Sequence, residues 1–259
     1  MRLIRLRRYK QGVYEEVEDW VAEEGLLVLR IEGAGARRFV ITPEMIREFV
    51  YGHLLGAGFI QKASEVASYR ERLRPETGMP GEVVEVEVSL RSPLGPVSTE
   101  EVIWAACGAE VPEGYSRLKR LSPHPLISEQ QLIRIPKLAA ERSEDFKLTG
   151  AYHYALLFDP ELRLLALAKD IGRHNAVDKV IGQALLAGAD LETAILYTTG
   201  RVTAGIALKA LQAGIPLVAS RGAALLGAVH LARRFRLGLV GFLRGERFNL
   251  YWGAGWLGR

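Results

Sequence analysis

The chain contains a single cysteine, Cys107, among its 259 residues. One cysteine excludes a disulfide within the chain, and it excludes zinc and iron–sulfur sites that are built from several cysteines. Apolar runs are short as well, and none reaches the roughly 18 residues that a membrane-spanning helix needs. The basic residues 1–10 run straight into polar residues and not into the apolar segment of a secretory signal. We therefore expect a cytoplasmic protein with no membrane partner.

The chain also lacks a long basic run and the interleaved aromatic residues of a single-strand nucleic-acid platform, so we expect no nucleic-acid partner. Its net charge of +4 comes from the C-terminal part. Residues 149–259 contain 13 Lys and Arg against 7 Asp and Glu, whereas residues 1–148 contain 21 against 23. Most of the C-terminal cations are arginines, whose planar fork suits phosphate and carboxylate. Solubility alone explains such an excess, and a small anionic ligand is the functional alternative.

The N-terminal part predicts a small α+β region. Residues 26–41 are typical of two short strands around a glycine-containing turn. Thr42-Pro43-Glu44 then predicts the start of a helix, with Thr42 as its N-cap and Pro43 as its first residue. The helix is expected to end at Gly56 or Gly58. Residues 82–90, in which valines alternate with carboxylates, predict a further strand.

A proline-rich stretch, residues 92–136, holds six of the eleven prolines and shows little periodicity, so it predicts a mobile connection. Cys107 lies within it. A lone thiol is most often an inert buried side chain. The alternative is a nucleophile whose thiolate is favoured by nearby cations such as Arg117, Lys119 and Arg120.

From Thr149 onward the sequence repeats strand, turn and helix, which favours an α/β layer with helices that cover a partly parallel sheet. We predict two regions, residues 1–148 and residues 149–259, with one continuous domain as the alternative. The predicted elements are strands at 151–158, 162–168, 194–198, 216–219, 238–242 and 248–251, and helices at 176–186, 203–211 and 223–234.

Three strand-to-helix junctions share a glycine, an arginine and a helix start. Glycine lets backbone N–H groups approach a ligand, a helix start presents unpaired N–H groups, and arginine binds phosphate oxygens. Because open α/β sheets bind ligands at the carboxyl ends of their strands, we predict one anion site built from distant segments. A fourth basic turn is expected to close over it. The junctions are Asp170-Ile171-Gly172-Arg173-His174-Asn175, Thr198-Thr199-Gly200-Arg201 and Ser220-Arg221-Gly222, and the fourth turn is Phe242, Leu243, Arg244, Gly245, Glu246 and Arg247.

Several of these residues have structural alternatives. His153 and His174 are each consistent with a hydrogen-bonded structural histidine, although His174 lies within a junction. Asp170 and Asn175 are both candidates for a helix cap. Asp178 and Lys179 are consistent with an ordinary charged helix face.

The run from Asp170 to Lys179, together with Thr149-Gly150-Ala151-Tyr152-His153, resembles the FdhD/NarQ family of formate dehydrogenase accessory sulfurtransferases. The resemblance covers about residues 26–251. It implies a cytidine-deaminase-like three-layer α/β sandwich with a mixed sheet, in a homodimer. It also implies that sulfur is accepted from a cysteine desulfurase as a persulfide. The sulfur then passes to the bis-molybdopterin guanine dinucleotide form of the molybdenum cofactor, before that cofactor enters formate dehydrogenase.

Carried over by position, the resemblance makes Cys107 the persulfide carrier, since it matches the first cysteine of the family's CGxCG loop. Glu110 stands at the second cysteine, so a paired-thiol mechanism is excluded, and a non-catalytic cofactor carrier is the alternative. GDP is expected to mimic the cofactor. No metal site is expected, because one cysteine cannot complete the His/Cys/Cys set of a zinc deaminase. The implied cofactor-binding residues are Phe242, Leu243, Arg244, Gly245, Glu246, Arg247, Thr149, Gly150, His153, Asp170, Gly172, Arg173, His174, Asn175, Asp178, Lys179, Thr199, Gly200, Arg201, Ser220 and Arg221.

Overall fold

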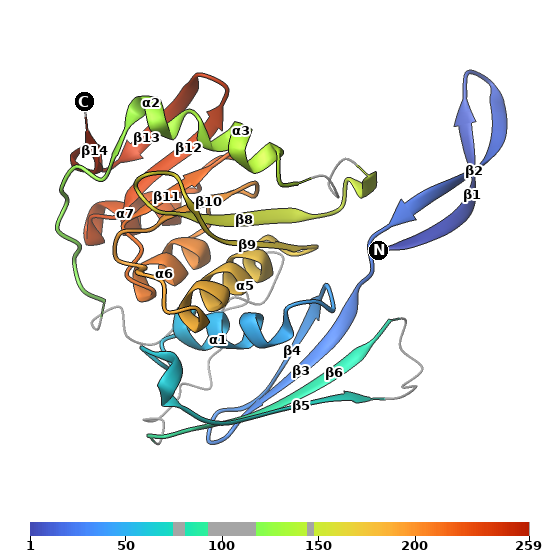
Figure 1. The fold of residues 1–259 in the computed structure, drawn as a ribbon, viewed down its shortest axis with the longest axis horizontal. Coiled ribbons are helices and arrows are strands. Elements are labelled where there is room, and N and C mark those ends of the chain that lie inside the picture. The colour runs from blue at the N-terminus through green and yellow to red at the C-terminus, as the bar shows by residue number, and fades with distance from the viewer. Residues whose placement is uncertain (75–80, 93–117, 144–147, 259) are drawn as a thin grey trace.

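A six-stranded mixed sheet organises the C-terminal part of the molecule (Figure 1). The computed structural model describes residues 1–74, 81–92, 118–143 and 148–258. The strand order is β13-β12-β11-β10-β8-β9, in which β10, β11 and β12 run parallel and β8 and β13 run antiparallel to their neighbours. The strands are β8 (His153–Phe158), β9 (Leu164–Asp170), β10 (Ile195–Thr198), β11 (Leu217–Ser220), β12 (Gly238–Arg244) and β13 (Arg247–Trp252).

Helices cover both faces of this sheet. One face packs against α5 (Arg173–Leu186), α6 (Ala204–Gln212) and α7 (Leu226–Phe235). The other packs against α2 (Glu129–Leu132) and α3 (Ile135–Ala140). Alternate side chains of β8 belong to the two cores, because successive side chains of a strand point to opposite faces. The expected three-layer α/β sandwich with a mixed sheet is confirmed.

A second, four-stranded sheet carries the N-terminal α+β region. Its order is β4-β3-β6-β5, formed by β3 (Gly25–Ile31), β4 (Gly35–Ile41), β5 (Val66–Arg74) and β6 (Val83–Leu90). Helix α1 (Ile46–Gly56) lies between this sheet and α5 (Figure 1). The hydrophobic core under α1 is continuous with that under α5 and α6. The division of the chain at residue 149 stays a prediction, although side chains from both sides share one core.

Two glycines let α1 and α5 approach closely. A Cβ atom added to Gly52 would lie 1.8 Å from the carbonyl oxygen of Asp178, and one added to Gly182 would lie 1.8 Å from the carbonyl oxygen of Glu48. Any side chain at either position would therefore force the two helices apart. This contact joins the N-terminal region to the larger sheet.

The remaining elements lie at the two ends of the chain. The N-terminal hairpin of β1 (Arg2–Lys10) and β2 (Val13–Val21) stands away from the rest of the molecule (Figure 1). At the other end, β14 (Leu257–Gly258) pairs with β7 (Ile127–Ser128), and short 3-10 turns occur at Ala63–Glu65 and Ala254–Trp256. Within the described ranges, every helix is too short or too polar to cross a membrane.

Two sequence predictions about the N-terminal half were wrong. Helix α1 begins at Ile46 and not at Pro43, and its N-cap is Met45, which has a left-handed backbone (φ 55°). Thr42 does not cap α1, because its hydroxyl accepts a hydrogen bond from the backbone of Ile171 instead. The proline-rich connection is also more ordered than expected, since its described part contains β7, α2 and the start of α3. Cys107 lies outside the described residues.

The C-terminal predictions are confirmed with shifted ends. Helix α5 begins at Arg173, three residues before the prediction, with Gly172 at its N-cap position. Asn175 therefore lies inside the first turn and does not cap the helix. Helix α7 begins at Leu226, three residues after the predicted start, because the chain from Arg221 first forms a bridge between Val202 and Ala224.

Candidate anion-binding site

One edge of the six-stranded sheet gathers all four predicted junctions. Strands β9, β10, β11 and β12 point the same way, and β8, which lies between β10 and β9 in the sheet, runs in the opposite direction. The carboxyl ends of those four strands therefore meet at that edge. The first residue of β8, His153, pairs with the last residue of β9, Asp170. Likewise Thr198, the last residue of β10, pairs with Ser220, the last residue of β11. Segments that are well separated in the sequence thus lie side by side.

The junctions touch one another through glycines. A Cβ atom at Gly200 would lie 2.7 Å from the Cβ of Arg173, and one at Gly222 would lie 3.1 Å from the backbone nitrogen of Arg201. The Ser220 hydroxyl, which is fully buried, donates to the carbonyl of Gly200 at 2.6 Å. The arginine-bearing bends therefore pack directly against each other.

The three junction glycines do not offer free N–H groups to a ligand. The N–H of Gly172 donates to Asp170 Oδ1 (2.8 Å), that of Gly200 to Thr198 Oγ1 (3.2 Å) and that of Gly222 to Ser220 Oγ (2.8 Å). Side-chain oxygens therefore occupy the N–H groups of these three glycines. Anion binding by the helix starts and by the arginine side chains at this edge stays a prediction.

The fourth turn contacts the third junction, and its closure over a ligand stays a prediction. The N–H of Phe242 donates to the carbonyl of Gly222 at 2.8 Å, and Arg244 Nε donates to the carbonyl of Arg221 at 3.0 Å. The Arg244 guanidinium lies 5.7 Å from the centre of the Phe242 ring. Phe242 has a left-handed backbone (φ 52°), which bends β12 at this point. Leu243 is buried in the second core, whereas Arg201, Arg221, Arg244, Gly245, Glu246 and Arg247 are exposed.

His153 lies among these arginines and is half-buried. Its Nδ1 is 3.5 Å from Thr199 Oγ1. Burial is the main cause that lowers the pKa of His153, and the charges of Arg173 and Arg201 lower it further, against an opposing effect of Asp170. In the protein alone, the imidazole of His153 is therefore neutral at neutral pH.

His174 lies in the interior, where it is a hydrogen-bonded structural histidine. It is 2% exposed, and its Nε2 lies 2.7 Å from the hydroxyl of Thr203, the residue that caps α6. Burial first, and then the charge of Lys209, lowers the pKa of His174 to about 3. This neutral histidine joins the start of α5 to the start of α6.

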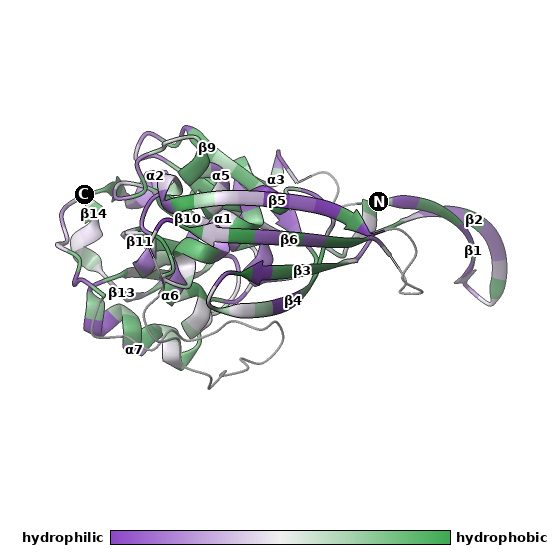
Figure 2. Cartoon of the chain, turned by 90° about the horizontal axis from the view of Figure 1, so that it is seen from below, coloured by the Kyte–Doolittle hydropathy of each residue, from purple (hydrophilic) through white to green (hydrophobic). Residues whose placement is uncertain are grey.

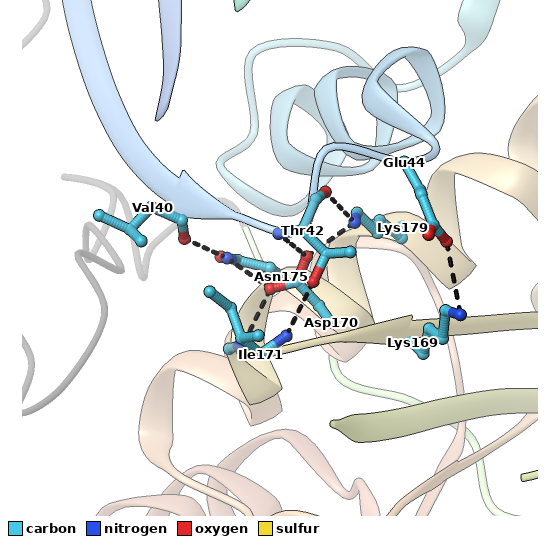
Figure 3. A network of polar contacts seen from close by, with 9 residues as sticks. Val40, Thr42, Glu44, Lys169, Asp170, Ile171, Asn175 and Lys179 are labelled. Carbon is cyan, nitrogen blue, oxygen red and sulfur yellow. Dashed lines mark hydrogen bonds and ion pairs between the residues drawn. The ribbon is translucent and has the colours of Figure 1, made fainter. Parts of the chain in front are cut away.

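Asp170 and Lys179 form a buried ion pair between the end of β9 and α5, and both residues bond to Thr42 just after β4 (Figure 3). Lys179 Nζ lies 2.7 Å from Asp170 Oδ2, and both side chains are 0% exposed. Lys179 also donates to the carbonyl of Thr42 at 2.9 Å, while the Thr42 N–H donates to Asp170 Oδ2 at 3.1 Å. The Asn175 amide donates both to Asp170 Oδ1 and to the carbonyl of Val40, each at 2.9 Å.

Asp178 and Lys209 of α6 form a second buried ion pair. Lys209 Nζ lies 2.7 Å from Asp178 Oδ1 and 2.8 Å from Oδ2, and His53 Nδ1 lies 3.7 Å from Oδ2. Burial acts to raise the pKa of Asp178, but Lys209 and His53 outweigh it and hold the pKa below its usual value. The alternative of a solvated helix face for Asp178 and Lys179 was wrong, because both are buried.

The structure thus separates the predicted binding residues into two groups. Thr149, Gly150, His153, Thr199 and the arginine-bearing bends lie at the sheet edge, and Gly150 turns the chain into β8 with φ 64°. Asp170, His174, Asn175, Asp178 and Lys179 lie beneath it, and each has at least one polar side-chain atom engaged inside the chain. Ligand binding by either group stays a prediction.

The sequence did not reveal that His53, Thr42 and Lys209 are partners of these residues. Each is distant in sequence from the junction that it supports, and the local sequence of Thr42 predicted a helix cap instead. Among the described residues, no group of three or more His, Cys, Asp and Glu side chains is arranged to hold a metal ion.

A surface hollow of about 570 Å³ lies elsewhere, on the four-stranded sheet. Arg30, Tyr69, Arg70 and Glu87 are among its lining residues. Two of its arginines are paired with carboxylates, since Arg30 Nε lies 2.8 Å from Glu85 and Arg70 Nη1 lies 3.5 Å from Glu87. Both of these arginines therefore have a carboxylate partner.

Comparisons with known proteins agree on one family. Residues 22–257 match the model of the FdhD/NarQ family. The chain is 34% identical over 257 residues to sulfur carrier protein FdhD of Sulfurisphaera tokodaii, which covers 97% of each chain. It is 35% identical over 253 residues to sulfur carrier protein FdhD of Corynebacterium efficiens, which covers 93% of this chain and 91% of that one. A crystal structure of a protein from Desulfotalea psychrophila, assigned as a formate dehydrogenase accessory protein, superposes with a TM-score of 0.74 at 26% identity and covers 97% of this chain and 96% of that one.

Proposed function

The chain belongs to the FdhD/NarQ family, and on that premise we propose that it is a sulfur carrier for the maturation of formate dehydrogenase. In this proposal Cys107 receives sulfur from a cysteine desulfurase, and the sheet edge holds the bis-molybdopterin guanine dinucleotide cofactor as cargo. The observation that carries the binding half is the convergence of four arginine-bearing bends at one edge. The names of the relatives support the sulfur-carrier half.

The sheet edge suits the phosphate part of such a cargo. Arg201, Arg221, Arg244 and Arg247 are exposed there, and Arg173 packs against the same bends. Guanidinium groups bind phosphate oxygens through paired hydrogen bonds, and those bonds are stronger when the donor is charged. The Phe242 ring and the Arg244 guanidinium, 5.7 Å apart, add flat surfaces against which a guanine base can stack.

The carrier step is a thiol–persulfide exchange. The Cys107 thiolate attacks the terminal sulfur of the donor's persulfide, a new sulfur–sulfur bond forms on Cys107, and the donor's own sulfur leaves as a thiolate. No net oxidation or reduction takes place, because the sulfur–sulfur bond that breaks is replaced by the one that forms. This chain has no second cysteine to resolve the persulfide, so the sulfur stays on Cys107 until the cargo accepts it.

The first experiment tests the carrier step by intact mass. The protein is incubated with a cysteine desulfurase and cysteine, and the expected gain is the mass of one sulfur atom. Cys107→Ser is expected to show no gain. A wild-type protein that gains nothing contradicts sulfur carriage.

The second experiment tests the binding half with GDP as the probe and calorimetry as the readout. Arg201→Ala and Arg221→Ala are each expected to weaken GDP binding by about tenfold, the effect of about 1.4 kcal/mol. Arg233→Ala is the matched control, because Arg233 is exposed on the last turn of α7, whereas the third junction precedes the first turn of that helix. Equal effects of all three changes, or no GDP binding at all, contradict the proposed site.

The single cysteine also favours a second candidate, a carrier that binds the cofactor without transferring sulfur. It predicts GDP binding that is unchanged by Cys107→Ser, together with no gain of sulfur in the wild-type protein. The two experiments together therefore separate the candidates.

A further inference from the structure

Strand β5 is a free edge of the four-stranded sheet. It pairs with β6 alone, because the strand order is β4-β3-β6-β5. From Ser68 to Arg74, its backbone has no hydrogen-bond partner outside β6 among the described residues. Figure 2, which looks onto the outer face of this sheet, shows β5 as its outermost strand. The N–H and C=O groups that point away from β6 are therefore open to pairing with another strand.

Opposite charges already lie side by side on the outer face of this sheet, which is turned away from α1. In the register of the two strands, Arg70 lies opposite Glu87, and Arg72 lies opposite Glu85. At the end of β5, Arg74 Nη2 lies 2.6 Å from Glu85 Oε2. Opposite charges across neighbouring strands stabilise a sheet. On its paired side, β5 is thus a basic strand next to an acidic one.

The arginines of β5 carry more positive charge than β6 neutralises. Glu85 is shared, because Arg30 Nε on β3 also lies 2.8 Å from it. The guanidinium of Arg70 is 3.5 Å from Glu87, and its side chain is 65% exposed. Arg72 is exposed, and no described residue forms an ion pair with it. The free edge of β5 is therefore bordered by a row of arginines with unused charge.

The inner face of β5, which points to the α1 side, is partly apolar. Tyr69 and Leu73 alternate with the arginines, because successive side chains of a strand point to opposite faces. Tyr69 packs against the larger hydrophobic core, and Leu73 is 63% exposed. Glu71, between them, accepts a hydrogen bond from the Tyr69 hydroxyl. A strand added at this edge would meet arginines on one face and apolar side chains on the other.

The same arginines decide which kind of molecule fits the edge. Charged side chains on an edge strand protect a protein from unwanted pairing, and here they repel a second basic strand. They attract an acidic strand. A nucleic acid fits less well, because the outer faces of β5 and β6 carry no aromatic side chain on which bases could stack. Glu85 and Glu87 would also repel its phosphates.

We propose that β5 binds an extended acidic segment of a partner protein, which adds to the sheet as a further strand. The backbone of the segment pairs with the free edge, and its alternate carboxylates lie beside Arg70, Arg72 and Arg74. Alternate residues of any extended strand are about 6.7 Å apart, so the spacing of the carboxylates matches that of the arginines. Backbone pairing supplies the affinity, and the charged side chains supply the specificity. This docking rests on no part of the proposed function.

The experiment measures peptide binding by fluorescence anisotropy. The probe is a short fluorescein-labelled peptide of alternating Glu and Val, the pattern that β6 itself presents to β5. A single added strand is held weakly, so we expect a Kd on the order of 100 μM at low salt. A peptide with Lys in place of Glu is expected to bind at least tenfold more weakly, because it sets like charges beside the arginines.

A third peptide separates backbone pairing from simple charge attraction. It keeps every Glu but carries N-methyl groups on two adjacent central residues, which removes an N–H from each of its edges. It is expected to bind at least tenfold more weakly than the unmodified peptide, because it can no longer pair fully with β5.

Variants of the protein place the site. Each opposite-charge pair across strands contributes up to about fivefold to binding, so Arg70→Gln with Arg72→Gln is expected to weaken the acidic peptide about tenfold. Arg72→Gln alone breaks no ion pair within the described chain, and about threefold weaker binding is expected from it. Arg233→Gln with Arg234→Gln is the matched control, because it removes the same charge from the exposed last turn of α7. Thermal melting followed by circular dichroism checks that each variant is folded.

Several results would overturn the inference. They are no binding of the acidic peptide at about 1 mM, equal binding of the Lys or N-methylated peptide, and equal effects of the β5 and α7 changes. Tighter binding of a single-stranded RNA, weakened by the same β5 changes, would assign the edge to a nucleic acid instead. Sedimentation that shows two copies joined through β5 would assign it to a second chain.

Discussion

Lys179→Met removes the cation from the buried pair between α5 and the end of β9, and with it the hydrogen bond to the Thr42 carbonyl after β4. The Asp170 carboxylate stays 0% exposed, and it loses a partner 2.7 Å away. Breaking a buried ion pair on one side costs about 3–5 kcal/mol, because an unpaired charge remains in the interior. Three hydrogen bonds still reach the carboxylate, from the backbones of Thr42 and Gly172 and from Asn175. We therefore expect the lower end of that range, a loss of about 3 kcal/mol in the free energy of unfolding.

Equilibrium unfolding in urea, followed by tryptophan fluorescence, measures this loss as a lower midpoint at an unchanged slope. Lys137→Met is the matched control, because Lys137 is exposed on α3, and its effect is expected to stay within about 0.5 kcal/mol. Adding Asp170→Asn to Lys179→Met is expected to recover part of the loss, since it removes the unpaired charge. A loss below about 1 kcal/mol for Lys179→Met would refute the reasoning that this pair holds the two regions together.

Three further predictions address other parts of the molecule. His174 has a pKa of about 3 in the folded protein, whereas in the unfolded chain it takes up a proton below its ordinary pKa of 6.5. Between pH 6.5 and 3 this residue therefore lowers the free energy of unfolding of the wild type by roughly 1.4 kcal/mol for each pH unit that the pH falls. Urea titrations at several pH values should show that the stability of His174→Asn depends less steeply on pH, by that amount. Gly52→Ala places a Cβ 1.8 Å from the carbonyl oxygen of Asp178, so it should destabilise the protein by about 3 kcal/mol, and an unchanged melting temperature would contradict the close approach of α1 and α5. A bound anion offsets the arginine charges that lower the pKa of His153, so GDP binding should take up a proton and strengthen as the pH falls; calorimetry in buffers of different ionisation enthalpy detects this uptake, and His153→Gln should abolish it.

The C-terminal sheet was largely predictable, because its strands and helices carry regular apolar patterns that are bounded by Gly, Pro and Asp. The arginine-bearing bends directly follow the ends of predicted strands, so their positions were predictable too. The parallel order of β10, β11 and β12 brings these bends to one edge. Helix starts were less predictable. Thr42-Pro43 fits a helix start locally, but the Thr42 hydroxyl is taken by the backbone of Ile171, 129 positions away in the sequence.

Charged segments account for most of the rest. Strands β1, β2 and β5 were missed because dense charge hides their alternation, and β5 has one buried residue, Val66. Asp178 and Lys179 fitted a solvated helix face because charged side chains are rarely buried without a partner. Their partners, Lys209 and Asp170, are set by tertiary packing, which the local sequence does not reveal.

The most direct test of the account is a crystal structure of the protein with GDP. The nucleotide is expected at the carboxyl ends of β10, β11 and β12, with its phosphates within hydrogen-bond distance of Arg201 or Arg221. A nucleotide bound in the hollow beside Arg30 and Arg70, with the arginine-bearing edge empty, would contradict it.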